Sequence, residues 1–216
     1  MATMKLQKIT DKSRPSAHRT YNDACGTAHA LDLIGERWSL LVVRELMMGP
    51  KRFGDLKADL PGISANVLTQ RLEGLEAAGL LVRRKLPPPA SVQVYELTQW
   101  GYESEPIFQT LGRWASRSQA HDPTLPFSSV SLMLSFRTMF SPERAAGLDA
   151  RVGFRIGEET FLVRIADGRL EAARAPLDAL AQAGMLAVEG DRALAERFVT
   201  LFPLPPKFDR DHPTVS

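Results

Sequence analysis

Apolar residues recur at helical spacing in two successive stripes between residues 53 and 79. The stripes are Phe53, Leu56 and Leu60, then Leu68, Leu72 and Leu75. Each set falls on one helix face, so two short helices are predicted. Pro61-Gly62 breaks the first helix, Ser64 can cap the second by accepting a hydrogen bond from a free backbone N–H, and Gly79 is a natural end. The pattern therefore predicts a helix–turn–helix.

The second helix carries a polar face with nothing obvious in the sequence to bury it. This face consists of Asn66, Thr69, Gln70 and Glu73. A helix–turn–helix of this shape can lay its second helix in the DNA major groove. A packed helical hairpin with a solvated face gives the same pattern, so the surrounding chain has to decide between the two.

The chain before this motif is predicted to hold a charged arm and two helices. Residues 1–20 have no sustained period, and Ala28, Leu31 and Ile34 indicate a helix over residues 24–34. Residues 35–48 are apolar on nearly every face, which predicts a buried helix anchored by Trp38 and ended by Gly49-Pro50.

After Gly79 the pattern changes to two strand-like runs, residues 80–86 and 91–97, around a proline-rich turn. A hairpin directly after a candidate recognition helix is typical of a DNA-binding wing. Arg83, Arg84 and Lys85 place three cations where a wing meets phosphates or a minor groove. A solvated edge hairpin guarded by charge is the alternative, and the preceding motif favours the wing.

Thr98 is predicted to cap a long helix that runs to residue 118 and is kinked at Pro106. Its large apolar residues are Ile107, Phe108, Leu111 and Trp114. They could pack on their own domain or on a second copy. DNA half-sites come in symmetric pairs, so we expect them to form a dimer contact.

The second half of the chain predicts a small α+β domain. Residues 121–127 read as a linker, and residues 128–206 contain a helix, three strand-like runs and two further helices around a short strand. The runs are 151–156, 160–166 and 169–174, and the later elements are 177–183, 185–188 and 191–201. Asp167-Gly168 is a strong hairpin signal, and residues 207–216 are left as a tail.

Composition narrows the function without assigning it. The net charge is only +2, with a balance of +4 over residues 1–121 and −2 over the rest, so a mildly basic front half suits phosphate contact. Four scattered histidines, one cysteine and the lack of a phosphate loop or nucleophile elbow argue against an enzyme. We therefore expect no catalytic residues, no metal and no cofactor.

The beginning of the chain is polar and lacks the apolar core of a signal peptide. The longest aliphatic run, residues 40–43, is too short to span a bilayer. We expect a cytoplasmic protein with no membrane partner.

The order of elements and a set of short segments resemble the HxlR family of winged-helix bacterial transcriptional regulators, relatives of the MarR group. The first segments are Cys25, residues 30–35, Trp38-Ser39-Leu40-Leu41, Arg44-Glu45-Leu46, Gly49-Pro50 and Arg52-Phe53. The others are residues 60–64, Leu68-Thr69-Gln70-Arg71-Leu72, Gly79-Leu80, Tyr95-Glu96-Leu97-Thr98 and Gly101. The resemblance covers about residues 24–118.

This resemblance implies a homodimer that binds double-stranded operator DNA through the helix starting near Ser64, with the wing beside it. By position, the DNA-binding candidates are Ser64, Asn66, Thr69, Gln70 and Arg71, together with Lys51, Arg52, Arg83, Arg84 and Lys85. Arg71 could instead pair with Glu73 or Glu76. The family usually has a basic residue near Val92 and an acidic one near Val94, so this wing departs from the pattern.

Cys25 has two readings. A cysteine at this place senses oxidants or electrophiles in several family members, and that chemistry needs a thiolate, which nearby positive charge would favour. His29 lies one turn away in sequence. A small buried hydrophobic residue is the alternative.

Segments of residues 128–204 resemble a sterol-carrier-protein-type (SCP2-like) fold, an antiparallel sheet covered by helices. They are residues 143–148, the hairpin 161–170 and residues 188–191. The resemblance implies either a pocket for an apolar small-molecule effector or a filled core that braces the dimer. A lipid-binding or carrier module is therefore a competing function, which the basic wing disfavours.

Overall fold

The computed structural model describes residues 20–175 and 192–208. The predicted arm up to residue 19, the predicted helix 177–183, the strand 185–188 and the end of the tail after residue 208 lie outside the described residues.

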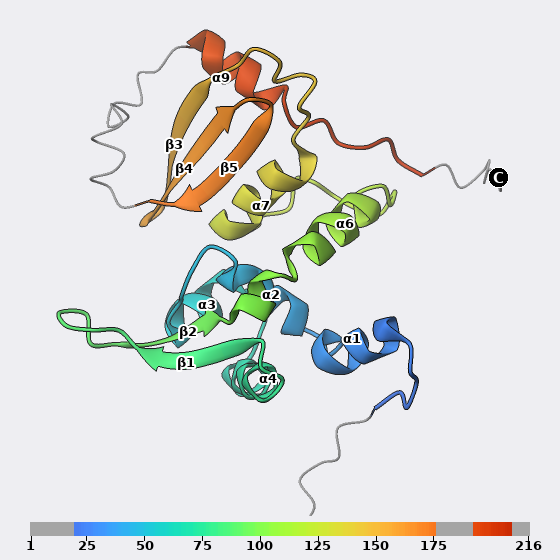
Figure 1. Ribbon diagram of the computed structural model, residues 1–216, viewed down its shortest axis with the longest axis vertical. Helices are drawn as coiled ribbons and strands as arrows, with labels where there is room; N and C mark the ends of the chain where they lie inside the picture. Colours follow the sequence, from blue (N-terminus) through green and yellow to red (C-terminus); the bar gives the residue numbers. More distant parts are fainter. Residues whose placement is uncertain (1–19, 176–191, 209–216) are drawn as a thin grey trace, which may run out of the picture.

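The first half of the chain forms a winged helix–turn–helix (Figure 1). Its helices are α1 (Gly26–Ile34), α2 (Ser39–Leu46), α3 (Phe53–Asp59) and α4 (Ala65–Ala77). The wing is an antiparallel hairpin of β1 (Leu81–Lys85) and β2 (Gln93–Leu97). Lys51 adds a backbone bridge to Tyr95, so the turn before α3 is tied to the wing.

The leucines of both apolar stripes are buried as predicted, whereas Phe53 is half-buried against the same core. Leu56, Leu60, Leu68, Leu72 and Leu75 are each at most 1% exposed and join one core with the apolar side of α2. The fully buried side chains of α4 are Leu68, Leu72 and Leu75, because a helix on the surface of a domain needs a single apolar stripe.

Two helix boundaries differ from the prediction. The buried helix begins at Ser39 rather than near residue 35, because Trp38 takes a left-handed backbone conformation with a φ of 80°. The predicted long helix is two helices, α5 (Gln99–Tyr102) and α6 (Glu105–Ala115). Pro106 lies in the first turn of α6, where a missing N–H costs no intrahelical bond, so it starts a helix instead of kinking one.

Gly101 is the point where α5 packs against the end of the helix–turn–helix. A Cβ at this position would lie 2.2 Å from the carbonyl oxygen of Leu80. The same carbonyl accepts the backbone N–H of Thr98 at 3.0 Å, so the backbone can approach closely only where a side chain is absent.

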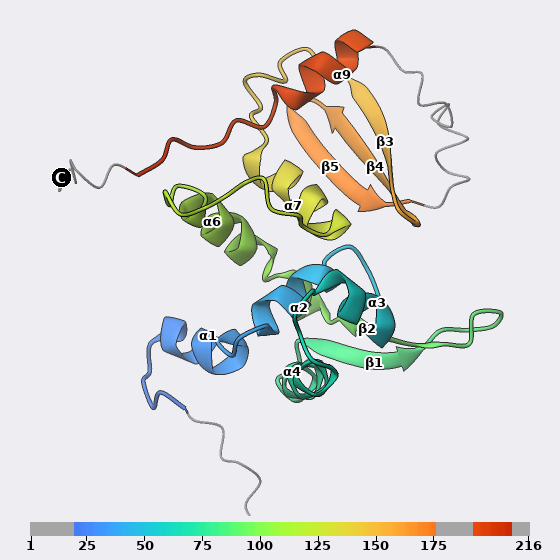
Figure 2. The same ribbon diagram turned by 180° about the vertical axis from the view of Figure 1, so that it is seen from behind.

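The second half places three antiparallel strands against two helices. The helices are α7 (Ser129–Met139) and α9 (Arg192–Val199), and the strands are β3 (Ala150–Ile156), β4 (Glu159–Ala166) and β5 (Arg169–Arg174), in the order β3-β4-β5. Asp167 and Gly168 have φ angles of 52° and 69°, which confirms the predicted tight turn. Figure 2 shows the strands from the other side.

Phenyl rings fill the space between the sheet and its helices. Phe136 of α7 lies 5.4 Å from Phe154, 5.3 Å from Phe198 and 4.7 Å from Phe202, measured between ring centroids. In the described part of this half, a filled core therefore fits better than a tunnel. The sterol-carrier-type resemblance is not confirmed.

The two halves share one apolar core, in which Val130 and Met133 of α7 join the α2 and α4 residues. Arg137 Nη1 also bonds Glu105 Oε2 of α6 at 2.6 Å. Past α9 the chain returns to the end of α6, where Lys207 Nζ donates to the carbonyl oxygens of Ser116, Ser118 and His121 at 2.9–3.1 Å.

Candidate nucleic-acid interface

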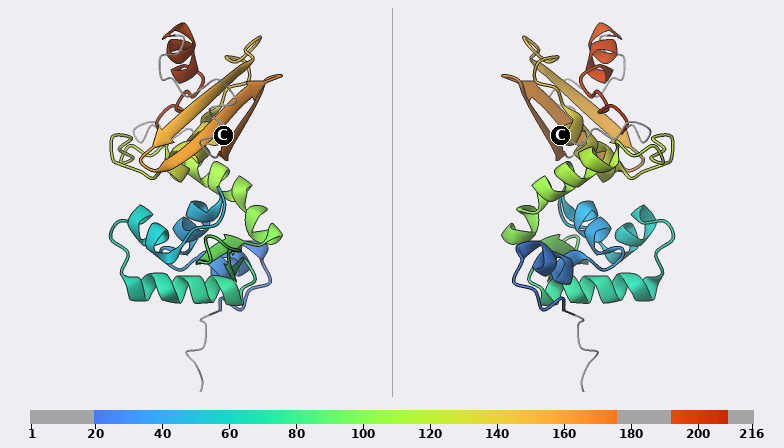
Figure 3. Two further views of the ribbon diagram at one scale, coloured as in Figure 1. Left: turned by 90° about the vertical axis from the view of Figure 1, so that its left-hand side faces the viewer. Right: turned by 90° about the vertical axis from the view of Figure 1, so that its right-hand side faces the viewer.

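One face of α4 is polar, exposed and free of internal bonds. Asn66, Thr69, Gln70 and Glu73 follow the spacing i, i+3, i+4 and i+7, and all are exposed. None of them makes a side-chain hydrogen bond or an ion pair with a described residue. Figure 3 shows α4 lying along one end of the molecule.

Ser64 fixes the start of this helix. Its Oγ accepts the backbone N–H of Val67 at 3.2 Å, as predicted for a cap. An N-terminus carries unpaired N–H groups and a positive dipole end, both of which suit a phosphate. Ser64 therefore fixes where the helix begins and lies at the end that suits a phosphate.

The wing cations are exposed, yet two of them have partners inside the domain. Arg83 Nη2 lies 3.2 Å from Glu76 Oε2, and its guanidinium stacks over the Tyr95 ring. Arg84 is paired with Glu96 on the facing strand, and this hydrogen bond raises the pKa of Arg84. Lys85 has no carboxylate partner among the described residues, so the positive charge of the wing is concentrated toward its tip.

Lys51 cannot be a DNA contact in this structure, which corrects the prediction. Its side chain is 1% exposed, and Nζ lies 3.5 Å from Glu45, 3.5 Å from Glu159 and in a shorter ion pair with Asp59. A buried ammonium is stabilised only where carboxylates surround it. One of these carboxylates comes from β4, 108 positions further on, so no local sequence signal could reveal it. Arg52, the neighbouring candidate, is exposed.

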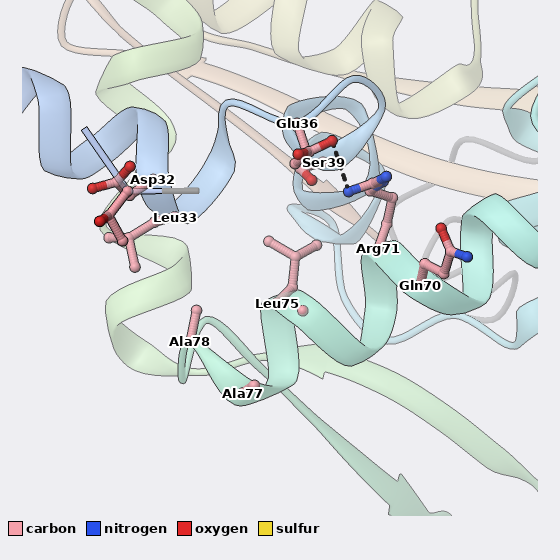
Figure 4. Close-up of a pocket in the computed structure, with 11 residues that line it drawn as sticks. Asp32, Leu33, Glu36, Ser39, Gln70, Arg71, Leu75, Ala77 and Ala78 are labelled. Atoms are coloured by element: carbon pink, nitrogen blue, oxygen red, sulfur yellow. Dashed lines mark ion pairs between the residues drawn. The ribbon is translucent and has the colours of Figure 1, made fainter. Parts of the chain in front are cut away.

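Arg71 points away from the exposed face of α4. Figure 4 shows its guanidinium directed at Glu36, with Nη1 3.1 Å from Glu36 Oε2, whereas Gln70 extends elsewhere. The predicted pairing with Glu73 or Glu76 is therefore wrong. The pair joins α4 to the turn before α2 beside a cavity of about 280 Å³, and so holds the recognition helix on its domain.

The outer side of α6 carries an apolar stripe. Ile107 is 45%, Leu111 42% and Trp114 70% exposed, and they line a shallow recess with Pro106. Phe108 is half-buried against the chain's own core, so it does not share this stripe. Exposed large apolar groups grouped in this way are typical of a protein–protein contact.

Cys25 is exposed at the N-cap position of α1, not buried. The backbone N–H of Ala28, followed by the backbone and hydroxyl of Thr27, holds the pKa of the Cys25 thiol below its usual value. The cause is hydrogen bonding at a helix N-terminus, which stabilises a thiolate. The residue pattern had pointed to His29 instead.

Residues 20–175 and 192–208 hold no group of three or more His, Cys, Asp or Glu side chains arranged to bind a metal ion. Within the same residues, no helix is long and apolar enough to cross a membrane.

Comparison with known proteins matches the first half of the chain. The sequence profile of the HxlR-like helix-turn-helix family matches residues 33–123. The chain is 36% identical over 88 residues to the HTH-type transcriptional regulator YodB of Bacillus subtilis, which covers 41% of this chain and 79% of YodB. It is 38% identical over 88 residues to the uncharacterized HTH-type transcriptional regulator YvaP of the same organism, covering 40% and 81%.

Solved structures give the same relatives. Reduced YodB from B. subtilis has a TM-score of 0.41 and 34% sequence identity, covering 45% of this chain and 98% of that one. Quinone-bound YodB has a TM-score of 0.37 and 33% identity, covering 42% and 96%.

Proposed function

Because the chain belongs to the HxlR-like helix-turn-helix family of transcriptional regulators, we propose that it binds double-stranded operator DNA in the cytoplasm as a homodimer. The observation that carries the proposal is the polar face of α4, exposed and unbonded, opposite a fully buried leucine stripe. A helix held from behind, with its donors and acceptors free in front, is suited to reading base edges.

The side chains have separate roles in this proposal. Asn66, Thr69 and Gln70 read bases, because amide and hydroxyl groups can pair with base edges in the major groove. The cations hold the phosphate backbone. These cations are Arg52, Arg83, Arg84 and Lys85. Ser64 adds a phosphate contact at the N-terminus of α4, and Arg71 can contact DNA only if it leaves Glu36.

The stripe of Ile107, Leu111 and Trp114 is the proposed dimer contact. It is apolar, exposed and on α6, outside the helix–turn–helix, so two copies can join without covering α4 (Figure 1). A two-fold dimer presents two recognition helices to two half-sites. Phe108 braces α6 from behind.

Gel shifts at rising salt test the regulator proposal. We expect the full chain to retain the duplex from upstream of its own gene better than a scrambled duplex. Affinity should fall steeply with salt, because each phosphate neutralised releases counterions. Equal retention of both duplexes at every salt concentration would contradict specific binding.

Two variants separate base reading from phosphate contact. Gln70→Ala should lose roughly 1–3 kcal/mol of binding free energy at particular base positions. Lys85→Gln should weaken all sequences alike and lower the salt dependence by about one phosphate contact. Binding measured on single-base variants of the site checks both; a uniform loss in Gln70→Ala would place Gln70 on the backbone.

Regulation through Cys25 is the second candidate function. Its exposure and its lowered pKa favour a thiolate that reacts with quinones or other electrophiles. The relative YodB has been solved with a bound quinone. Cys25 stands at the N-cap position of α1, and α1 contacts α4, so modification of Cys25 could change how the recognition helix is supported.

For this second function, diamide or quinone treatment should change operator affinity at least roughly fivefold in the wild-type chain and not in Cys25→Ser. Alkylation by iodoacetamide should also reach its half-maximal rate at a lower pH than for free cysteine, because the helix N–H groups favour the thiolate. Unchanged affinity after treatment of the wild type would exclude sensing.

An apolar small-molecule effector, if one acts, is best placed between the two halves. A cavity of about 540 Å³ lies between α6, residues 121–127 and α7, and its lining includes Phe108, Phe127, Leu134 and Met139. A ligand there would touch the helix that carries the proposed dimer stripe. In the described residues, the ring of Phe136 packs against those of Phe154, Phe198 and Phe202 in the sheet core, which disfavours a lipid carrier.

A further inference from the structure

The outer face of the three-stranded sheet is rich in arginine. Side chains alternate between the two faces of a strand, and the inner set carries the buried residues Phe161, Val163 and Ile165. The outer set contains Arg151, Arg155, Arg164, Arg169, Glu171, Gly153, Thr160, Leu162, Ala166 and Ala173. Four arginines thus stand against one glutamate.

These arginines are exposed and have no partners in the described chain. None of the four forms an ion pair or a side-chain hydrogen bond with a described residue. In contrast, Arg174 at the edge of the same sheet is paired with Glu159. The sheet therefore neutralises a cation at its edge but leaves four on its outer face.

The register places two of the arginines directly opposite each other. Arg151 pairs with Arg164 across β3 and β4, and Arg164 pairs with Glu171 across β4 and β5. Like charges directly opposite destabilise a sheet. A cost of this kind is offset when an anionic partner binds across both side chains.

The neighbouring row of the sheet is small and apolar. Gly153, Leu162 and Ala173 are register partners, with Leu162 half-buried in the middle. Arg155 lies on the far side of this row. The face is thus a shallow apolar strip with guanidinium groups on both sides.

We propose that this arginine face (Arg151, Arg155, Arg164 and Arg169) docks an acidic polypeptide segment that carries an apolar side chain between its carboxylates. Guanidinium groups bind carboxylates through two parallel hydrogen bonds, and arginine is enriched in protein–protein interfaces. The apolar side chain of the segment would rest on Leu162, and its carboxylates would reach the arginines on both sides.

The composition of the face favours polypeptide over nucleic acid. Its ten outer positions include no aromatic residue on which a base could stack, and Glu171 would repel a continuous phosphate backbone. A discrete set of carboxylates can avoid Glu171.

The position of the face also separates it from the operator. In Figure 1 the sheet lies at the opposite end of the molecule from α4, with α2 and α7 between them. The inner face of the sheet is covered by α7 and α9, since Phe136 and Phe198 both contact Phe154. An acidic partner can therefore bind while α4 is engaged.

Fluorescence anisotropy on the full chain tests this, with a labelled peptide of Glu-Glu-Leu repeats and the matching Gln-Gln-Leu peptide. The triple variant Arg151→Gln, Arg164→Gln, Arg169→Gln should bind the acidic peptide roughly tenfold more weakly at low salt. The Gln peptide should bind weakly to both proteins. Thermal unfolding should show that the variant is folded, since removing Arg151 and Arg164 relieves repulsion.

The matched control removes the same charge from the wing, through Arg83→Gln, Arg84→Gln, Lys85→Gln. This wing variant should keep its peptide affinity and lose DNA affinity. The sheet variant should lose peptide affinity and keep its DNA affinity. Equal loss of peptide affinity in both variants would overturn the proposal. So would tighter binding of this face to duplex DNA or to phosphatidylglycerol vesicles than to the peptide. A wild-type chain that binds the acidic peptide but not the operator duplex would contradict only the regulator proposal.

Discussion

Lys51→Met is expected to lower the free energy of unfolding by about 3–5 kcal/mol, the range for removing one partner of a buried ion pair. Methionine fills a similar volume but supplies no charge. Glu45 is fully buried and keeps Arg44, at 2.7 Å, and the Ser128 hydroxyl. Asp59 loses its ammonium partner, whereas Glu159 keeps Arg174 and the Ser129 hydroxyl.

Denaturant unfolding of the two proteins measures the loss. Lys57→Met is the matched control, because Lys57 lies half-buried on α3 and makes no described side-chain bond. It should change stability by less than about 0.5 kcal/mol, as surface substitutions usually do. Similar losses in both variants would show that the buried charge network adds nothing to the free energy of unfolding beyond what a surface lysine adds.

Leu111→Glu is expected to separate the dimer and to weaken operator binding by roughly a hundredfold, since a contact residue worth about 3 kcal/mol changes an equilibrium constant by that factor. The introduced carboxylate would have to lose water against Ile107 and Trp114 of the second copy. Leu111 is 42% exposed in the single chain, so the fold itself should survive.

Light scattering after size-exclusion chromatography measures the mass, and gel shifts measure DNA binding. Leu125→Glu gives the control: the same substitution at a 63% exposed leucine outside α6. It should leave both measurements unchanged. A Leu111→Glu protein that keeps the mass and operator affinity of the wild type would place the dimer contact on another surface.

The parts of the fold that sequence could predict are those set by local periodicity. The leucine stripe of α4, the Ser64 cap and the Asp167-Gly168 turn each depend on residues within one or two turns of each other, so their pattern survives in the printed sequence. The polar face of α4 was predictable for the same reason, because it is what remains once the buried stripe is assigned.

The parts that sequence could not predict depend on partners distant in the chain. Lys51 looks like a surface cation beside Arg52, and only the folded chain brings Asp59 and Glu159 to it. Arg71 has two glutamates within one or two turns, yet its partner is Glu36, which precedes the helix by more than two dozen residues. Ionic side chains are long, and their choice of partner follows tertiary packing rather than spacing.

The break between α5 and α6 has a related cause. Helical pattern runs through residues 98–118, but Gly101 must approach Leu80 closely, and the chain then turns at Ser104 before α6 begins. Because α5 packs against the helix–turn–helix, its axis is fixed there, and α6 runs in a different direction. Pro106 therefore lies at the start of α6 and does not kink a longer helix.

The bonds from Lys207 to the end of α6 can form only late in synthesis. The carbonyl oxygen of Ser116 is made 91 residues before the ammonium that bonds it. A nascent chain thus contains α4 and α6 before Lys207 is made, and until then the carbonyl oxygens of Ser116, Ser118 and His121 lack this ammonium. A chain that ends before residue 207 would keep α6 but lack the ammonium that bonds these three carbonyl oxygens.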